Sequence, residues 1–139
     1  MCSGCYLLKK EEYVKQYGYA TEMELFHATC RSNVSSITMN NLDWRRSVCT
    51  KFGEGVSFSP RAGYANLHCN RSNPTHHAMI ITKVLVHSTS FGSCYMKLPS
   101  SNADTSTGNA VSVYVKYSDN EFYPTYEAYY DSTPIPRRR

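Results

Sequence analysis

The amino-acid sequence predicts an α+β domain with short helices and a mostly antiparallel sheet. Residues 78–86 (AMIITKVLV) form the strongest strand pattern, because they begin apolar on both faces, which is typical of a central strand. Residues 111–117 alternate apolar and polar side chains, as half-buried strands do. Residues 6–17 instead repeat apolar side chains at three- and four-residue spacings, which predicts an amphipathic helix.

The first half of the chain alternates short predicted helices with short predicted strands. The helix at residues 6–17 is expected to end at Gly18, a residue type that favours helix C-caps. The buried side of this helix is expected to hold Leu7, Tyr13, Val14 and Tyr17. The elements expected next are a strand at 23–27, a helix within 32–39, a strand at 56–58 and a helix at 61–69. Trp44 is expected to anchor packing.

The second half of the chain is mainly predicted strand. Residues 70–76 predict a polar loop, and residues 99–110 (PSSNADTSTGNA) predict a second loop of a kind that often borders a site. The final strand, at residues 121–130, contains Pro124, which lacks a backbone N–H and so predicts a sheet edge or a bulge. No repeat or second domain is indicated, so residues 1–139 are interpreted as one domain with a basic tail at 131–139.

The charge pattern argues against a nucleic-acid-binding module. Charged residues make up 19% of the 139 residues, and the net charge is +4. Three of these four charges correspond to Arg137, Arg138 and Arg139, so the body of the chain is nearly neutral. No apolar run reaches the roughly 18 residues that would indicate a membrane span.

Six cysteines are scattered along the chain without the spacing of a disulfide framework. Cys2 and Cys5 form a lone C-x-x-C motif with no second pair, so no metal site is expected. Residues 1–20 carry charges from Lys9 to Glu12, where a signal peptide would be apolar. We therefore expect reduced thiols in a cytoplasmic or nuclear protein that is not secreted.

Residues 24–29 (ELFHAT) place His27 where a short buried strand meets a loop. A neutral imidazole offers one ring nitrogen as a hydrogen-bond donor and the other as an acceptor. Two interpretations stay open from this stretch alone: a structural histidine whose partners lie in the fold, or a histidine that binds a ligand. The stretches that follow favour the second interpretation.

Several stretches in the same order resemble the catalytic domains of poly(ADP-ribose) polymerases (PARPs), over about residues 6–130. They are FHAT at 26–29, NLDWR at 41–45, FGEGVSF at 52–58, AGYAN at 62–66, KVLV at 83–86 and VYVKYSDNEFYPTY at 113–126. The resemblance is nearest to the mono-ADP-ribosylating branch of the family. It implies a mostly antiparallel split sheet with short helices, and a chain that lacks the N-terminal part of the family domain.

The resemblance also implies that NAD is the substrate, with nicotinamide released and ADP-ribose moved to a protein acceptor. The residues that it implies for NAD binding are His27, Ala28, Thr29, Ser57, Ala65 and His68. His27 would hold the adenosine-ribose hydroxyl, and the backbone of Ala28, where the family usually has Gly, would pair with the nicotinamide amide. Ser57 and His68 stand where aromatic residues of the family sandwich the nicotinamide ring, and Ala65 stands where a hydroxyl is usual.

The catalytic positions implied by the resemblance are His27, Ser57 and Val113. Val113 stands where polymerising members carry a Glu that stabilises the ribose cation and activates the acceptor hydroxyl. General-base help is worth roughly 10²–10⁴ in rate, so polymer synthesis is not expected without it. Two functions follow from this pattern: an NAD-dependent mono-ADP-ribosyltransferase acting on protein acceptors, or an inactive relative that serves as a binding domain.

Overall fold

The computed structural model describes residues 3–42, 52–67, 77–93, 96–100, 102–108 and 112–130, and it has the α+β class that the sequence predicts. Within these residues the helices are α1 (Ser3–Tyr17), the 3₁₀ turn η1 (Arg31–Asn33), α2 (Val34–Asn40), α3 (Ala62–Leu67) and the 3₁₀ turn η3 (Asp119–Glu121). The strands are β1 (Glu22–Cys30), β2 (Val56–Phe58), β3 (His77–Leu85), β4 (Thr89–Phe91), β5 (Thr105–Gly108), β6 (Val113–Lys116) and β7 (Phe122–Tyr130). Trp44 and His68 lie outside the described residues.

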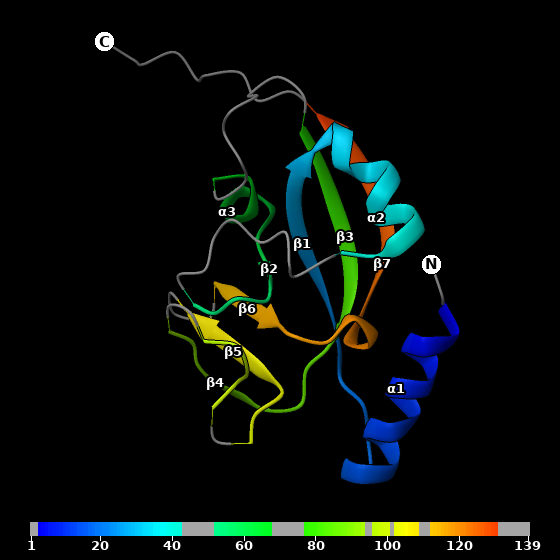
Figure 1. Ribbon diagram of the computed structural model, residues 1–139, viewed down its shortest axis with the longest axis vertical. Coiled ribbons are helices and arrows are strands. Elements are labelled where there is room, and N and C mark those ends of the chain that lie inside the picture. The colour runs from blue at the N-terminus through cyan, green and yellow to red at the C-terminus, as the bar shows by residue number, and fades with distance from the viewer. Residues whose placement is uncertain are drawn as a thin grey trace.

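Three strands form sheet A in the order β1-β3-β7, and both strand pairs are antiparallel (Figure 1). β3 is the central strand, as its apolar pattern predicts. β7 lies at the edge of this sheet, and its register with β3 shifts between Ile81 and Thr82, opposite Pro124. The edge position and the bulge predicted for Pro124 are therefore both confirmed, because either accommodates a residue without a backbone N–H.

Four strands form sheet B in the order β2-β6-β5-β4. β4 and β5 are parallel, whereas the other two pairs are antiparallel. The prediction of a loop over residues 99–110 is wrong at β5, and no apolar pattern marks β4 either. The sequence of β5, Thr-Ser-Thr-Gly, is typical of a polar loop, yet all four residues are buried because β4 and β6 flank them on both sides.

Helices α2 and α3 cover opposite faces of sheet A. Ile80 of β3 belongs to the hydrophobic cluster under α2, whereas its neighbour Met79 belongs to the cluster under α3. Successive residues of a strand face opposite sides of a sheet, so these two clusters lie on opposite faces. Figure 1 shows α3 to the left of β1 and α2 to the right.

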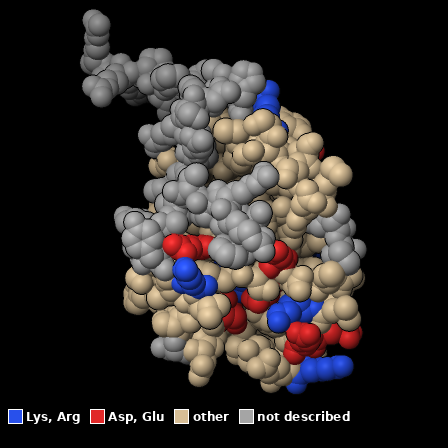
Figure 2. Space-filling model, viewed as in Figure 1, with Lys and Arg blue, Asp and Glu red and all other residues tan. Residues whose placement is uncertain are grey.

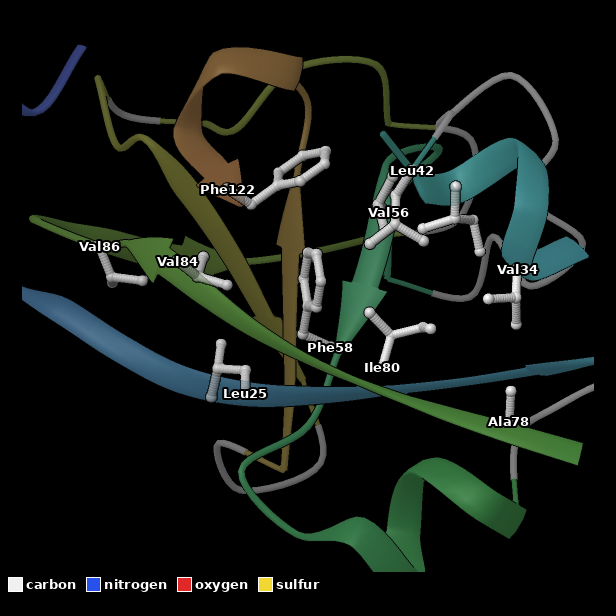
Figure 3. Packing of buried hydrophobic residues seen from close by; sticks show 11 residues of the cluster. Leu25, Val34, Leu42, Val56, Phe58, Ala78, Ile80, Val84, Val86 and Phe122 are labelled. Atoms are coloured by element: carbon white, nitrogen blue, oxygen red, sulfur yellow. The ribbon is translucent and has the colours of Figure 1, made fainter. Parts of the chain in front are cut away.

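The main hydrophobic core joins the two sheets. Phe58 of β2 and Phe122 of β7 contribute two phenyl rings whose centroids are 5.3 Å apart. Figure 3 shows these rings together with Leu25 and Ile80, which come from β1 and β3. Phe58 is 2% exposed and Phe122 is 1% exposed, and burial of each such side chain contributes about 1.5–3 kcal/mol. This contact therefore holds sheets A and B together as one body.

Helix α1 turns a stripe of tyrosines toward the fold, which confirms the expectation for Tyr13 and Tyr17 but not for Leu7 and Val14. Tyr6 and Tyr13 are buried, and Tyr17 packs beside them. Leu7 and Val14, expected to be buried, are 57% and 45% exposed. Each follows a buried tyrosine by one residue and is therefore rotated from it by about 100° around the helix. The expected end of the helix is confirmed, because the N–H of Gly18 bonds to the Val14 carbonyl at 2.8 Å and Gly18 has a φ of +84°.

A buried lysine connects sheet B to the rest of the molecule. Lys116 of β6 is 0% exposed, and its Nζ lies 2.6 Å from Oε1 of Glu121 and 3.4 Å from Oδ1 of Asp104. The same ammonium donates to the carbonyl of Leu85 at 2.8 Å. Tyr13 of α1 donates its hydroxyl to Glu121 at 2.8 Å, and burial together with the Glu121 charge raises the pKa of Tyr13. Lys116 thus links β6, the end of β3, η3 and α1.

The other ion pairs among the described residues lie nearer the surface. Figure 2 shows acidic and basic side chains intermixed over the lower part of one face, where α1 and sheet B lie in Figure 1. On α1, Lys9 pairs with Glu12 at 3.2 Å, and Lys10 pairs with Glu22 of β1. Exposed pairs contribute about 0–1 kcal/mol each, so Lys116 is the charge of the described residues with the largest expected effect on stability.

The Lys116→Met substitution is expected to lower the free energy of unfolding by about 3–5 kcal/mol, because Asp104 and Glu121 then stay largely buried without their cation. Urea denaturation followed by circular dichroism measures this change. The control Lys9→Met removes only a surface pair and should cost less than about 0.5 kcal/mol. Equal effects of the two substitutions would contradict a structural role for the buried lysine.

Candidate functional site

Sheets A and B meet beside His27 along one pair of backbone hydrogen bonds. Phe26 of β1 donates its N–H to the carbonyl of Ser59 at 2.7 Å, and Ser59 donates its N–H to the carbonyl of Phe26 at 2.9 Å. We call this pair of hydrogen bonds the sheet seam. It brings β2, and with it Ser57, beside the C-terminal half of β1.

His27 uses one ring nitrogen to hold this seam. Its Nδ1 lies 2.8 Å from the backbone oxygen of Ser57. Because a carbonyl can only accept a hydrogen bond, Nδ1 carries the proton, and Nε2 of the neutral ring keeps its acceptor lone pair. The imidazole also packs edge-on against the ring of Phe58, with 5.9 Å between centroids. His27 is therefore structural through Nδ1, whereas Nε2 accepts no hydrogen bond from the described residues.

The protonation state of His27 follows from its surroundings. Burial lowers the pKa of His27 below its ordinary value near 6.5, and the hydrogen bond to Ser57 offsets part of that shift. The imidazole is therefore neutral at pH 7. A neutral ring is the form that can accept a hydrogen bond from a hydroxyl group through Nε2.

Ala28 points its backbone groups at the open edge of β1. Successive residues of an antiparallel strand direct their N–H and C=O groups to opposite sides. Phe26 directs these groups at Ser59, so Ala28, two residues further, directs its own groups at the same edge. No described residue forms a hydrogen bond with them. A carboxamide offers a matching donor and acceptor, so this edge can bind one.

The other site residues that the resemblance implies on β1 and α3 either contact apolar side chains or stabilise the local fold. Ala28, Ala65 and Met79 form a small buried cluster, so the structure brings Ala65 next to Ala28. The hydroxyl of Thr29 accepts a hydrogen bond from Nδ2 of Asn33 at 3.0 Å and thereby fixes η1. Thr29 thus contributes to the local fold through its side chain.

Sheet B positions Ser57 and Val113. Ser57 pairs with Val115 of β6, and Val113 lies two residues before Val115 on the same strand. Val113 is 7% exposed and pairs with Gly108 of β5. The position that the resemblance assigns to the family's Glu therefore holds a buried isopropyl group. His68, the remaining implied residue, lies outside the described residues.

Glycines determine where β2 begins. A Cβ added to Gly55 would lie 2.2 Å from the carbonyl oxygen of Lys116, and one added to Gly108 would lie 2.3 Å from the ring of Phe52. Only glycine permits such close approaches without displacement of the neighbour. The FGEG turn at 52–55 therefore docks on β5 and β6, and this docking fixes the height of Ser57 in the sheet.

Arg61 lies close to these residues although no signal in the sequence marks it. Its Nη2 donates to the hydroxyl of Ser112, the residue before Val113. An arginine at the start of a helix is usually a solvated surface charge, and nothing in the local pattern distinguishes Arg61 from one. Its place beside β6 depends on the approach of β2 to β6 in the folded chain.

Comparison with protein families settles the relationship of the chain. The model of the Poly(ADP-ribose) polymerase catalytic domain matches residues 6–128. The chain belongs to this family. The match confirms the PARP resemblance, and the mixed α+β fold with antiparallel pairing agrees with it. No match is found among curated proteins.

This PARP domain is thus a member of an ADP-ribosyltransferase family, whose members use NAD as substrate and proteins as acceptors. The resemblance implies departures from the family pattern at four described positions, Ala28, Ser57, Ala65 and Val113. At three of them, Ser57, Ala65 and Val113, the resemblance implies a side-chain group that this chain lacks. At Ala28 the groups required by the resemblance belong to the backbone, and these are kept.

The described residues of the PARP domain contain no group of three His, Cys, Asp or Glu side chains placed to hold a metal ion. In the same part of the chain, none of the helices is long and apolar enough to cross a membrane.

The stability of the PARP domain is expected to fall with acid in a way that depends on His27. Its folded pKa lies below the unfolded value near 6.5, so the unfolded chain binds more protons below pH 6.5, and unfolding becomes easier as the pH falls. His27→Asn should remove this pH-dependent contribution of His27 to stability. The melting temperature of the variant should therefore fall less between pH 7.5 and pH 5.5 than that of the unsubstituted protein. Thermal scans at both pH values measure it, and identical losses would contradict a buried neutral His27.

Proposed function

We propose that this PARP domain is an NAD-dependent mono-ADP-ribosyltransferase that modifies protein acceptors and releases nicotinamide. The observation that carries the proposal is the succession of two groups on β1: His27, whose Nε2 keeps its lone pair, is followed by Ala28, whose N–H and C=O form no hydrogen bond with the described residues. A ribose hydroxyl can donate to the first group, and the nicotinamide carboxamide can pair with the second. We place this activity in the cytoplasm or nucleus, as the pattern of cysteines predicts.

The substitution at Ser57 weakens NAD binding in this proposal without abolishing it. Serine can donate or accept a hydrogen bond but cannot stack on the nicotinamide ring. An aromatic pair contributes about 0.5–1.5 kcal/mol beyond the area that it buries. Its loss therefore reduces affinity by roughly 2- to 13-fold. A site with lowered affinity can still act on NAD when the substrate is abundant.

The residue at position 113 selects the acceptor chemistry. An oxygen of an acceptor carboxylate forms the new bond to the ribose C1″, while the bond from C1″ to the nicotinamide nitrogen breaks. The electron pair of that bond returns to the ring nitrogen, so neutral nicotinamide leaves and no proton is removed. A ribose hydroxyl as acceptor would need a general base worth roughly 10²–10⁴ in rate, and Val113 cannot supply one.

The second candidate is a catalytically inactive PARP domain that binds a partner. It is favoured by the cluster of Ala28, Ala65 and Met79, each at most 9% exposed. The methyl group of Ala28 takes up space beside its own backbone that glycine would leave open for a ligand. Release of labelled nicotinamide from NAD separates the two candidates, because only the enzyme produces it.

The products of the active protein are expected to be single ADP-ribose units, because Val113 provides no carboxylate for elongation. Incubation with radiolabelled NAD and candidate acceptor proteins, followed by gel electrophoresis, measures product length. Polymer ladders would contradict the assignment. The control Val113→Glu should still yield single units, since Ser57 leaves the nicotinamide pocket without its aromatic residue.

His27→Asn is expected to weaken binding of a non-hydrolysable NAD analogue by roughly 3- to 100-fold, because it removes the acceptor at Nε2. The amide nitrogen of Asn can replace Nδ1, so the bond to Ser57 and the melting temperature should be largely kept. Calorimetric titration measures the affinity.

The matched variant His27→Gln carries its amide group nearer the position of Nε2 and loses the bond to Ser57. It should therefore unfold at a lower temperature and keep more of the affinity than His27→Asn. Unchanged affinity in a well-folded His27→Asn protein would exclude His27 from the NAD site.

A further inference from the structure

We propose that Arg61 is the acceptor-orienting residue of the site, and that it binds the carboxylate of an acidic acceptor side chain beside β6. This inference rests on the proposed function, because it concerns the second substrate of the same reaction. It adds a residue that neither the family resemblance nor the sequence pattern assigns to the site.

Two hydrogen bonds fix the position of Arg61. Its backbone N–H donates to the hydroxyl of Ser59 at 3.1 Å, at the point where β2 leaves the sheet seam. Its side chain reaches the residue before β6, where Nη2 donates to the hydroxyl of Ser112. Ser112 is 3% exposed, so this anchor for the guanidinium is itself held firmly. Arg61 as a whole stays exposed, so its charged group can be reached by an external ligand.

The guanidinium of Arg61 has unused binding capacity. It carries five N–H donors in a fixed planar fork, and the bond to Ser112 uses one of them. Among the described residues no carboxylate forms an ion pair with it. The remaining donors match a carboxylate, which arginine binds through two parallel hydrogen bonds.

The charge balance at the start of β6 favours an acidic acceptor. Val113 places an uncharged side chain where the family has a carboxylate, and Arg61 places a cation at the preceding residue. An acceptor carboxylate that leaves water for this site loses hydration, and the guanidinium offsets that loss. A lysine acceptor would instead meet a like charge. The pair of residues therefore selects an acceptor that brings its own negative charge.

Another oxyanion in the reaction could be the ligand of Arg61, namely the diphosphate of NAD. The two sources differ in which binding step depends on the arginine. A diphosphate ligand would make the affinity for the NAD analogue depend on Arg61. A carboxylate ligand would make the affinity for the acceptor depend on it.

The test compares Arg61→Gln with Ser112→Ala, which removes the anchor but keeps the guanidinium. One probe is a fluorescein-labelled peptide of Gly, Ala and Ser with three central Glu residues, and its control carries Gln instead. Fluorescence polarisation measures peptide binding, calorimetry measures binding of the NAD analogue, and transfer from labelled NAD gives KM and kcat for the peptide.

Arg61→Gln is expected to weaken binding of the Glu peptide, and raise its KM, by roughly 10- to 150-fold, as loss of charged hydrogen bonds predicts. Affinity for the Gln peptide and for the NAD analogue should change less than threefold. Ser112→Ala should have a smaller effect on the Glu peptide than Arg61→Gln, although it breaks the same structural bond.

Two results would overturn the proposal. One is a Glu-peptide affinity that does not respond to Arg61→Gln, or responds equally to Ser112→Ala, which would leave Arg61 a structural link. The other is a loss confined to the NAD analogue, which would assign the diphosphate as the ligand. If the unsubstituted protein binds the Glu peptide through Arg61 but releases no nicotinamide, the enzymatic function fails and the acidic-ligand site stands.

Discussion

The sheet seam between Phe26 and Ser59 is the constraint on which the site depends. Its two backbone hydrogen bonds join a strand of sheet A to the segment that ends a strand of sheet B. Because the seam sets the register of β2 against β1, it decides that Nδ1 of His27 meets the carbonyl of Ser57. It also ends just before Ala28, and so leaves the backbone groups of that residue at an edge where no described residue pairs with them. A shift of this pairing by one residue would turn the site's groups to the wrong side.

Contacts made by β2, β6 and the turn before β2 support the seam. Phe58 and Phe122 pack the two sheets together through apolar contact, which is strong but not directional. Lys116 adds a directional contact. A buried ammonium requires its acceptors at fixed positions, and here these are the carboxylates of Glu121 and Asp104. The glycines around Phe52 then set the depth at which the turn before β2 sits. Together these contacts determine where β2 can lie.

The chemistry proposed for this PARP domain depends on backbone groups more than on side chains. The edge of Ala28 survives substitution of its side chain, because the N–H and C=O groups belong to every residue except proline. The roles that the resemblance implies at positions 57 and 113 belong to side chains, and Ser57 and Val113 cannot fill them. A domain of this kind can still recognise its substrate NAD. Its acceptors, however, are limited to nucleophiles that are already ionised when they bind. Arg61 is proposed to provide the positive charge that complements the carboxylate of such an acceptor.

The sequence by itself determined the features that depend on local pattern. The central place of β3, the end of α1 at Gly18 and the bulge at Pro124 each follow from apolar runs or backbone chemistry within a few residues, and all three were correct. The family motifs also predicted site positions at His27, Ala28, Ser57, Ala65 and Val113, and these assignments stay predictions. Only the tertiary structure decided which face of α1 is buried, because Tyr13 has a distant partner in Glu121. It alone revealed β5 and the burial of Lys116. The sequence of β5 is as polar as that of a loop, and a lysine is normally expected at the surface, so both features become recognisable only when neighbouring strands enclose them. The pairing of His27 with Ser57 and the reach of Arg61 to Ser112 join residues far apart in the chain, and such contacts exist only once the two sheets have met.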